Sequence, residues 1–343
     1  MSDSYGLFFP ALLAGTIFVA CSDGASNPTT AASSAAVTRA ASTVGAGGSG
    51  AAGGGDLGGA GGEGAGWPEP PPDYCNLCQL TDTFPIATPL LIELSGLAAS
   101  ADHAGAYYAH NDSGDTARFF ALDSMGADLG VYTLEAVAAQ DFEDIARGPC
   151  GAGSCLFIGD IGDNDLQRSL YVVYRVPEPD MLAPGTYSTL PSQLKLEYPN
   201  GPRNAEAMIV HPQTGEMWLL PNEPGTSNTG IYHAPGGLQP NVVTTLTKLG
   251  EFATPQGIPF VSGADMHPMG FGVLVRTFSH LFYYARSGPE EPLEETFQRA
   301  PCVMPVANED QGEAVAWTAA GDGYVTASEG PGNVLHHAAC TTQ

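Results

Sequence analysis

The sequence predicts an all-β protein that folds as a single β-propeller. A short apolar strand recurs five times, and its starts, at Ser95, Glu143, Glu206, Ser262 and Glu313, lie 48, 63, 56 and 51 residues apart. Further short strands rich in β-branched and aromatic residues follow each start, separated by Gly, Pro, Asn and Asp. Four short strands per unit, at a spacing of about 50 residues, are typical of propeller blades.

The N-terminus predicts export. An apolar run over residues 6–20 is too short for a comfortable membrane span and suits the core of a signal peptide. Residues 18–21 (FVAC) resemble a bacterial lipoprotein cleavage site. We therefore expect residues 1–21 to be a signal peptide and Cys21 to be lipidated.

A long low-complexity segment follows. Residues 22–74 are dominated by Ala, Gly, Ser, Thr and Pro, which cannot offset the entropy of ordering their backbone. They predict a disordered tether in front of a propeller at residues 83–343. A lipidated protein would be held at the outer membrane or cell surface; without the lipid it would be secreted or periplasmic.

Within each unit the strands follow a common order. A second strand ends in a polar loop, an aromatic-rich third strand comes next, and a fourth is visible in most units. The fifth unit ends after its third strand, so we expect a strand over residues 88–94 to supply the fourth and close the ring, which removes two exposed edges. Five four-stranded blades are counted in this way. A sixth, degenerate blade around residues 176–205 or 286–310 is the alternative.

The net charge limits the partners. The chain has 37 Asp and Glu against 11 Lys and Arg, a formal charge of −26. Such a surface repels phosphate backbones and anionic lipids, so we expect no nucleic acid partner and no membrane contact except through the lipid anchor. The charge favours metal cations or cationic ligands. The alternative is that acidic loops only keep an exported protein soluble.

Two cysteines form an evident pair. Six cysteines remain besides Cys21, and an even number in an exported protein indicates disulfides. Cys150 and Cys155 flank a short Gly-rich loop, which predicts that they bond to each other.

The other four cysteines leave two pairings open. Cys75 and Cys78 form a C-x-x-C without the βαβ surroundings of a redox motif, so we expect a structural bridge between them. Cys302 and Cys340 would then tie the last blade to its neighbour. The alternative joins Cys75 and Cys78 to Cys302 and Cys340.

Blade geometry predicts where a site lies. Successive strands reverse direction, so the start of the first strand and the loop between the second and third strands share one face. Side chains from both places therefore gather around one mouth of the central channel. The expected metal ligands are Glu143, Glu206 and Glu313 at strand starts, and Asp160 and Asp163 in one loop. The expected ligand-binding residues are Asn111, Asp112, Asn222, Glu223, Arg276 and Glu329.

The chemistry of this set favours calcium. Carboxylates this close raise one another's pKa unless a cation neutralises them. Oxygen-rich sets without sulfur suit calcium, which takes six to eight oxygens. Arg276 would grip an anionic group or pair with a carboxylate. The alternative is that Asp and Asn only form turns and Glu only begins a strand. His211 and His267, at matching positions before Pro, are interpreted as loop residues.

Four segments resemble an uncharacterised family of exported bacterial β-propellers: residues 141–146 (DFEDIA), 159–164 (GDIGDN), 174–179 (YRVPEP) and 311–314 (QGEA). More remotely, the glutamates at strand starts are similar to the metal-ligating acids of SMP-30/gluconolactonase and calcium-dependent phytase-like propellers. That resemblance implies calcium ligation by Glu143, Glu206 and Glu313. The chain lacks the Lys and Arg cluster with which a phytase holds phosphate.

The expected function is recognition. We expect a monomeric, envelope-tethered propeller that binds a small-molecule or envelope ligand, with calcium, at the acidic mouth. One alternative is a calcium-dependent hydrolase of a lactone or phosphate ester, in which a metal-bound water attacks and a carboxylate acts as base. The other is a purely structural scaffold.

Overall fold

A computed structural model describes residues 67, 72–255, 260–330 and 332–341, all within one compact unit that spans residues 63–343. The predicted signal peptide, Cys21 and most of the predicted tether lie outside the described residues. Among the described residues, no helix is both long and apolar enough to cross a membrane.

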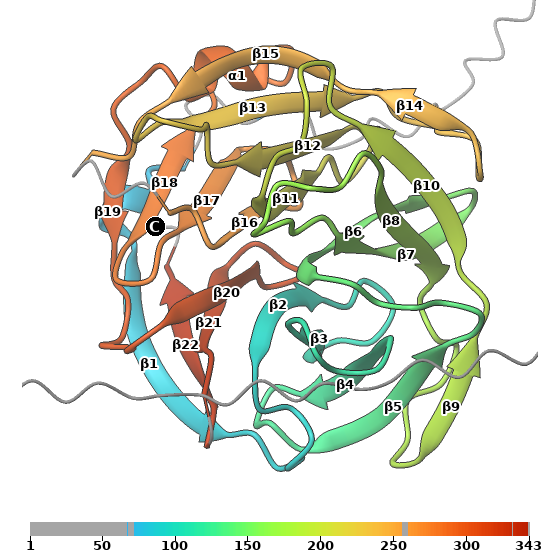
Figure 1. Cartoon of the computed structure of the whole chain (residues 1–343). Coiled ribbons are helices and arrows are strands. Elements are labelled where there is room, and N and C mark those ends of the chain that lie inside the picture. Colours follow the sequence, from blue (N-terminus) through green and yellow to red (C-terminus); the bar gives the residue numbers. More distant parts are fainter. Residues whose placement is uncertain (1–66, 68–71, 256–259, 331, 342–343) are drawn as a thin grey trace, which may run out of the picture. The chain divides into compact units, whose positions relative to one another are not determined.

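Five sheets surround a common axis as the blades of a propeller (Figure 1). Blade 1 contains β2 (Leu94–Ala99), β3 (Ala106–Asn111), β4 (Arg118–Asp123) and β5 (Asp128–Leu134). Blade 2 contains β6 (Phe142–Cys150), β7 (Gly153–Asp160), β8 (Tyr171–Pro177) and β10 (Ser192–Glu197). Blade 3 contains β11 (Ala205–Val210), β12 (Met217–Pro221), β13 (Thr229–Ala234) and β15 (Thr247–Phe252). Blade 4 contains β16 (Gly263–Met266), β17 (Gly272–Arg276), β18 (Leu281–Ala285) and β19 (Cys302–Met304). Blade 5 contains β20 (Gly312–Trp317), β21 (Gly323–Ser328), β22 (Val334–Cys340) and β1 (Cys78–Pro85).

The predicted fold class is confirmed, with five blades. Residues 176–205 hold β10 and β9 (Thr186–Thr189), and β9 pairs in parallel with β5 of blade 1. In the same way β14 (Val243–Thr245), from the connection within blade 3, pairs in parallel with β10 of blade 2. Residues 286–310 hold the short helix α1 (Leu293–Thr296) and β19. Within the described residues these segments supply the fourth strands of blades 2 and 4 and an additional strand of blade 1, so neither forms a sixth blade.

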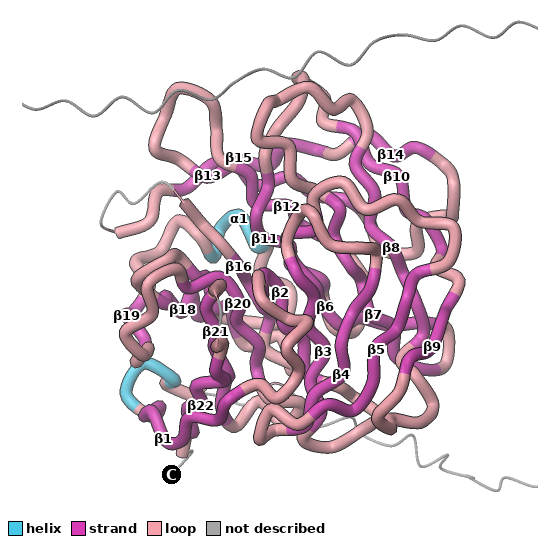
Figure 2. The backbone as a smooth tube through the Cα atoms, turned by 60° about the horizontal axis from the view of Figure 1, so that its bottom comes forward, coloured by secondary structure: helices cyan, strands magenta, loops and turns pink. Residues whose placement is uncertain are grey.

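The inner strands form a tightly joined ring. The first strand of each blade packs against those of both neighbours, and apolar clusters fill the space between blades. The buried Asp144 carboxylate accepts hydrogen bonds from the backbone N–H of Ile145 (2.8 Å), Met208 (2.8 Å) and Ala264 (3.4 Å). It thereby connects the inner strands of blades 2, 3 and 4. The strands run between two faces of loops (Figure 2).

The closing strand lies earlier than predicted. β1 pairs antiparallel with β22, from Cys78 opposite Cys340 to Pro85 opposite Val334, and completes blade 5. The predicted strand over residues 88–94 is wrong, because this segment leads into the inner strand of blade 1. Its Leu91 and Leu94 pack in the core between blades 5 and 1. The sequence pattern does not predict β1, because most of its side chains are polar and exposed and show no apolar alternation.

The disulfides follow from this closure. The Cys150–Cys155 bond is confirmed. The pairs Cys75–Cys78 and Cys302–Cys340 are wrong, and the alternative holds, since the structure joins Cys75 to Cys302 and Cys78 to Cys340. Neighbouring cysteines diverge because Cys78 begins β1 beside β22, whereas Cys75 lies in the short helix η1 (Tyr74–Asn76), which contacts β19.

Candidate functional site

Three glutamates occupy irregular positions at the start of inner strands. The register against the second strand shifts between Phe142 and Asp144, between Ala205 and Met208, and between Gly312 and Ala314. Glu143, Glu206 and Glu313 lie in these shifts. A β-bulge re-aims a side chain out of the regular alternation, and bulges recur at the rims of closed sheets. The three glutamates therefore lie outside the regular alternation of side chains along their strands.

These glutamates form a cluster with aspartates of neighbouring loops. We call Asp112, Asp141, Glu143, Glu206, Glu313 and Glu329 the acidic mouth. Carboxylate oxygens of Asp112, Asp141 and Glu143 all lie within 4.8 Å of one another. Glu206 and Glu329 repel Asp112 and Glu313 electrostatically, which links the other members to this triad.

Burial and mutual repulsion act together on these groups. Burial, reinforced by Glu206, raises the pKa of Glu143 well above its usual value. Burial and the nearby Glu329 and Asp112 raise the pKa of Glu313 to about 8. The pKa values of Asp112 and Asp141 rise to about 6, mainly through burial. Without a cation, Glu313 therefore retains its proton near neutral pH, and the other three groups keep theirs to a higher pH than usual.

A repeated pattern distinguishes Glu143 from the other two glutamates. Asn204, two residues before Glu206, donates its amide to Glu206 Oε1 at 2.6 Å. Gln311, two residues before Glu313, donates to Glu313 Oε1 at 2.8 Å. The same position before Glu143 holds Asp141, which as a carboxylate can only accept. The triad of Asp112, Asp141 and Glu143 thus contains only hydrogen-bond acceptors, whereas in blades 3 and 5 a side-chain amide donates to the glutamate.

The loop over residues 159–164 closes against this triad. A Cβ on Gly162 would clash with Glu143 Oε1 and with the Asp141 carboxylate, so any larger residue would force these carboxylates to move. Gly162 N–H donates to the Asp141 carbonyl at 3.3 Å, which sets the distance between loop and strand. The GDIGDN segment therefore shapes the acidic mouth through its backbone.

The two aspartates of that loop have other partners. Asp160 pairs with Arg168 at 2.8 Å and accepts from the backbone N–H groups of Gln140 and Asp141. Asp163 accepts from the backbone of Gln167 and Arg168 and from the Tyr171 hydroxyl. Their oxygens hold the loop together, which leaves little capacity for an ion.

Two of the expected ligand-binding residues lie deeper than expected. Arg276 is fully buried and pairs with Glu309 between blades 4 and 5, so it cannot grip a ligand at the rim. Glu223 pairs with Lys248 (3.0 Å) and Arg203 (3.4 Å) within blade 3. Order along the chain did not reveal these partners, because they come from distant segments.

The other expected ligand-binding residues are near the mouth. Asn111 accepts from the backbone N–H groups of Ile92 and Glu93 and so holds the start of blade 1. Asn222 N–H donates to the carbonyl of Asn204 at 3.1 Å. Glu329 accepts from the Gln311 amide. Only Asp112 and Glu329 of the expected set belong to the acidic mouth itself.

The residues missed by the sequence analysis share one feature. Asp141, Asn204 and Gln311 each stand two residues before a glutamate at the start of an inner strand. This x-to-Glu spacing recurs in three units and was visible in the sequence. The spacing could be interpreted only with the structure, because the β-bulge at each strand start is what brings the two side chains of a pair together.

No family model matches the chain, and no curated protein matches it. Among solved structures the chain is similar to Raptor from Chaetomium thermophilum, with a TM-score of 0.42 and 9% sequence identity. The match covers 79% of this chain but 30% of that chain. At this level the similarity bears on neither the site nor its chemistry.

Proposed function

We propose that the propeller binds calcium at the acidic mouth, and with it a ligand that lies across the channel opening. The observation that carries the proposal is the triad of Asp112, Asp141 and Glu143, whose oxygens face one another within 4.8 Å. Three acceptors without a donor among them are stable together only when protons or a cation neutralise them. A bound cation would stabilise the Glu143 carboxylate, as the amides of Asn204 and Gln311 stabilise Glu206 and Glu313 in blades 3 and 5.

The donor set favours calcium over other metals. The triad offers only carboxylate oxygens, and Glu206 adds another carboxylate beside Glu143. Hard oxygen ligands suit calcium and magnesium, and calcium accepts irregular geometry and six to eight ligands. The triad would leave several coordination positions for water and for oxygens of a bound ligand. The ligand class favoured by this chemistry carries hydroxyl or carboxylate groups that reach the ion.

Recognition at the cell envelope is the function that these features support best. Arg168 acts electrostatically on Asp141, but it is already paired with Asp160, so an anionic substrate would depend mainly on the metal for charge. The alternative function at the same site is hydrolysis of a lactone or phosphate ester. A carboxylate with a raised pKa, such as Glu313, would then accept the proton of the attacking water.

Calcium titration by calorimetry tests the proposal. Wild-type protein is expected to give saturable heat with calcium, and Glu143→Gln is expected to lose at least most of it. Asp102→Asn, a change of an exposed aspartate on a different loop, serves as the charge-matched control and should bind like the wild type.

A panel of lactones and phosphate esters then separates binding from catalysis. Calcium heat without turnover supports a recognition module, whereas calcium-dependent turnover that disappears in Glu143→Gln supports the hydrolase. Wild-type protein that gives no calcium heat would contradict both.

A further inference from the structure

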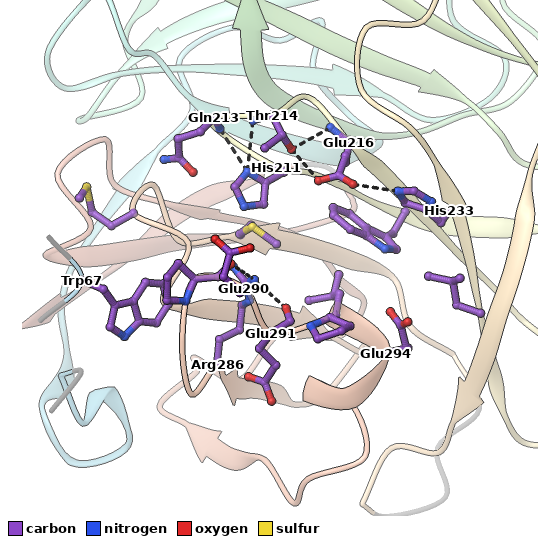
Figure 3. A pocket seen from close by; sticks show the side chains of 17 residues that line it. Trp67, His211, Gln213, Thr214, Glu216, His233, Arg286, Glu290, Glu291 and Glu294 are labelled. Atoms are coloured by element: carbon purple, nitrogen blue, oxygen red, sulfur yellow. Dashed lines mark hydrogen bonds and ion pairs between the residues drawn. The ribbon is translucent and has the colours of Figure 1, made fainter. Parts of the chain in front are cut away.

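A cavity lies between blades 3 and 4, away from the acidic mouth. It has a volume of about 520 Å³, within the range of small-molecule sites (Figure 3). The residues that form it include His211, Trp218, His233, Met266, Glu290 and Glu294. His211, Glu290 and Glu294 lie in connections between first and second or third and fourth strands, and Trp218, His233 and Met266 lie near the strand ends that such connections join. The cavity, which we call the inter-blade pocket, therefore opens on the face opposite the acidic mouth.

The equivalent place between blades 4 and 5 is filled by a tyrosine. Tyr74 comes from η1, ahead of the first strand, and its hydroxyl lies 2.8 Å from His267 Nε2. Its ring lies 5.0 Å from the ring of Trp317 and 5.5 Å from that of Tyr283, both in edge-on contact. The site thus holds a phenol ring between aromatic walls, with a histidine at the hydroxyl.

The two places correspond residue by residue. His211 and His267 each follow the last residue of an inner strand and precede Pro212 and Pro268. Each histidine faces the turn of the next blade at a glycine of positive φ, Gly270 (75°) for His211 and Gly321 (72°) for His267.

The walls correspond as well. Met266 and Trp317 are the last residues of inner strands β16 and β20. The cross-strand pair of Trp218 and His233 in blade 3 matches that of Leu274 and Tyr283 in blade 4. The inter-blade pocket therefore resembles the Tyr74 site one blade earlier. Trp67 from the N-terminal segment lies at its side, with its ring beside Phe271 and Arg286, and no tyrosine of the described residues lines the remaining space.

The hydrogen bonds of His211 in the inter-blade pocket leave its Nε2–H as a hydrogen-bond donor. His211 Nδ1 accepts from the backbone N–H groups of Gln213 and Thr214, both at 3.3 Å (Figure 3). The proton of the neutral ring is therefore on Nε2. Within the described residues His211 Nε2 has no hydrogen-bond partner, whereas His267 Nε2 lies within hydrogen-bond distance of both Tyr74 and the Gly321 carbonyl.

Charge at the pocket favours a cation. Glu291 pairs with Arg299, and Glu216 lies 3.3 Å from His233, so these two are partnered. Arg286 is buried, with its guanidinium donating to the carbonyls of Gly270, Pro289 and Glu291. Glu290 and Glu294 form no ion pair within the described residues, and Figure 3 shows both beside the pocket. Arg286 also lines the pocket and attracts Glu290, but four glutamates line it against this one arginine, so the opening keeps a net negative charge.

We propose that the inter-blade pocket binds a small molecule that carries a phenol ring and a positive charge. The ring lies where Tyr74 lies in the equivalent site, its hydroxyl oxygen accepts from His211 Nε2–H, and the charge faces Glu290 and Glu294. This site is separate from the acidic mouth and needs no calcium.

Titration with tyramine, followed by ligand-observed NMR, tests this site in the full chain with a chelator present. Tyramine carries both features. Phenethylamine lacks the hydroxyl, and 3-(4-hydroxyphenyl)propionate replaces the positive charge with a negative one. Tyramine is expected to bind saturably, and each of the other two to bind about three- to tenfold more weakly. Equal binding of all three compounds, or no saturable binding of tyramine, would overturn the proposal.

Two variants locate the bound molecule. His211→Asn keeps an acceptor near the Nδ1 position but removes the Nε2–H, and should weaken tyramine roughly three- to tenfold while leaving phenethylamine unchanged. Glu290→Gln changes an exposed residue and should weaken tyramine about two- to fivefold with no effect on p-cresol. His280→Asn, on the opposite face, is the matched control. If both pocket variants bind tyramine as the wild type does, the site is elsewhere and the proposal fails.

Discussion

Replacement of all four cysteines of the ring-closing disulfides by serine is expected to lower the free energy of unfolding by about 5 kcal/mol. Cys75–Cys302 and Cys78–Cys340 join residues 227 and 262 positions apart, so they remove much of the entropy of the unfolded chain. Cys78–Cys340 also fixes β1 against β22, without which blade 5 has an open edge, and Cys75–Cys302 fixes η1 to β19 of blade 4. Thermal unfolding should shift downward by roughly 10 °C.

The third disulfide provides the control. Cys150 and Cys155 are five positions apart and already lie on paired strands, so their replacement by serine should cost only about 2 kcal/mol. Chemical denaturation of both variants under non-reducing conditions gives the comparison. Equal losses in the two variants would show that ring closure does not limit the stability of the propeller.

The acidic mouth should make the cation-free protein less stable as the pH rises. The pKa of Glu313 is about 8 in the folded protein, against an ordinary value of 4.5 when unfolded. Between these values the folded state binds the proton that the unfolded state has released. This contribution to stability is complete below pH 4.5 and is lost as the pH rises toward 8. For Glu313 alone the loss between pH 5 and 8 is on the order of 3 kcal/mol.

Comparison with Glu313→Gln isolates this contribution. Buried His110 and His267, whose pKa values are lowered to about 4, change stability in the opposite direction, but they are common to both proteins. In chelator, the variant should therefore gain about 3 kcal/mol relative to the wild type between pH 5 and 8, measured by urea unfolding. Excess calcium should remove most of the difference, because the ion stabilises the ionised carboxylates. A difference that stays constant with pH would contradict the raised pKa.

The fold was predictable because each blade repeats the same local signals. Short, mostly apolar first strands and polar loops recur in every unit, and third strands with Phe or Tyr recur in four of the five, and the structure confirms the five blades. β1 was not predictable in this way, since its sequence CQLTDTFP has no apolar alternation and its place depends on β22, far along the chain. The same long-range pairing decides the partners of Cys75 and Cys78, whose closeness in sequence favoured the wrong bridge.

The sequence predicted where the candidate site lies, but it did not predict which of its carboxylates have other partners. Glu143, Glu206 and Glu313 gather at one mouth as strand order requires. Which carboxylates are free for a ligand depends on partners that sequence order does not give. Asp160 has Arg168, and Arg276 is buried against Glu309. The sequence alone does not single out Asp141. Its role follows from the structure, because the equivalent positions in blades 3 and 5 hold the side-chain amides of Asn204 and Gln311.

Asp141→Asn tests the central claim most directly, because it gives blade 2 the amide that blades 3 and 5 already have. The account predicts that calorimetry of the wild type shows one saturable calcium site. It predicts that this variant loses the site and, in chelator at pH 8, unfolds at a higher urea concentration than the wild type. An Asp141→Asn protein that binds calcium with wild-type affinity would show that the acidic mouth is not the metal centre.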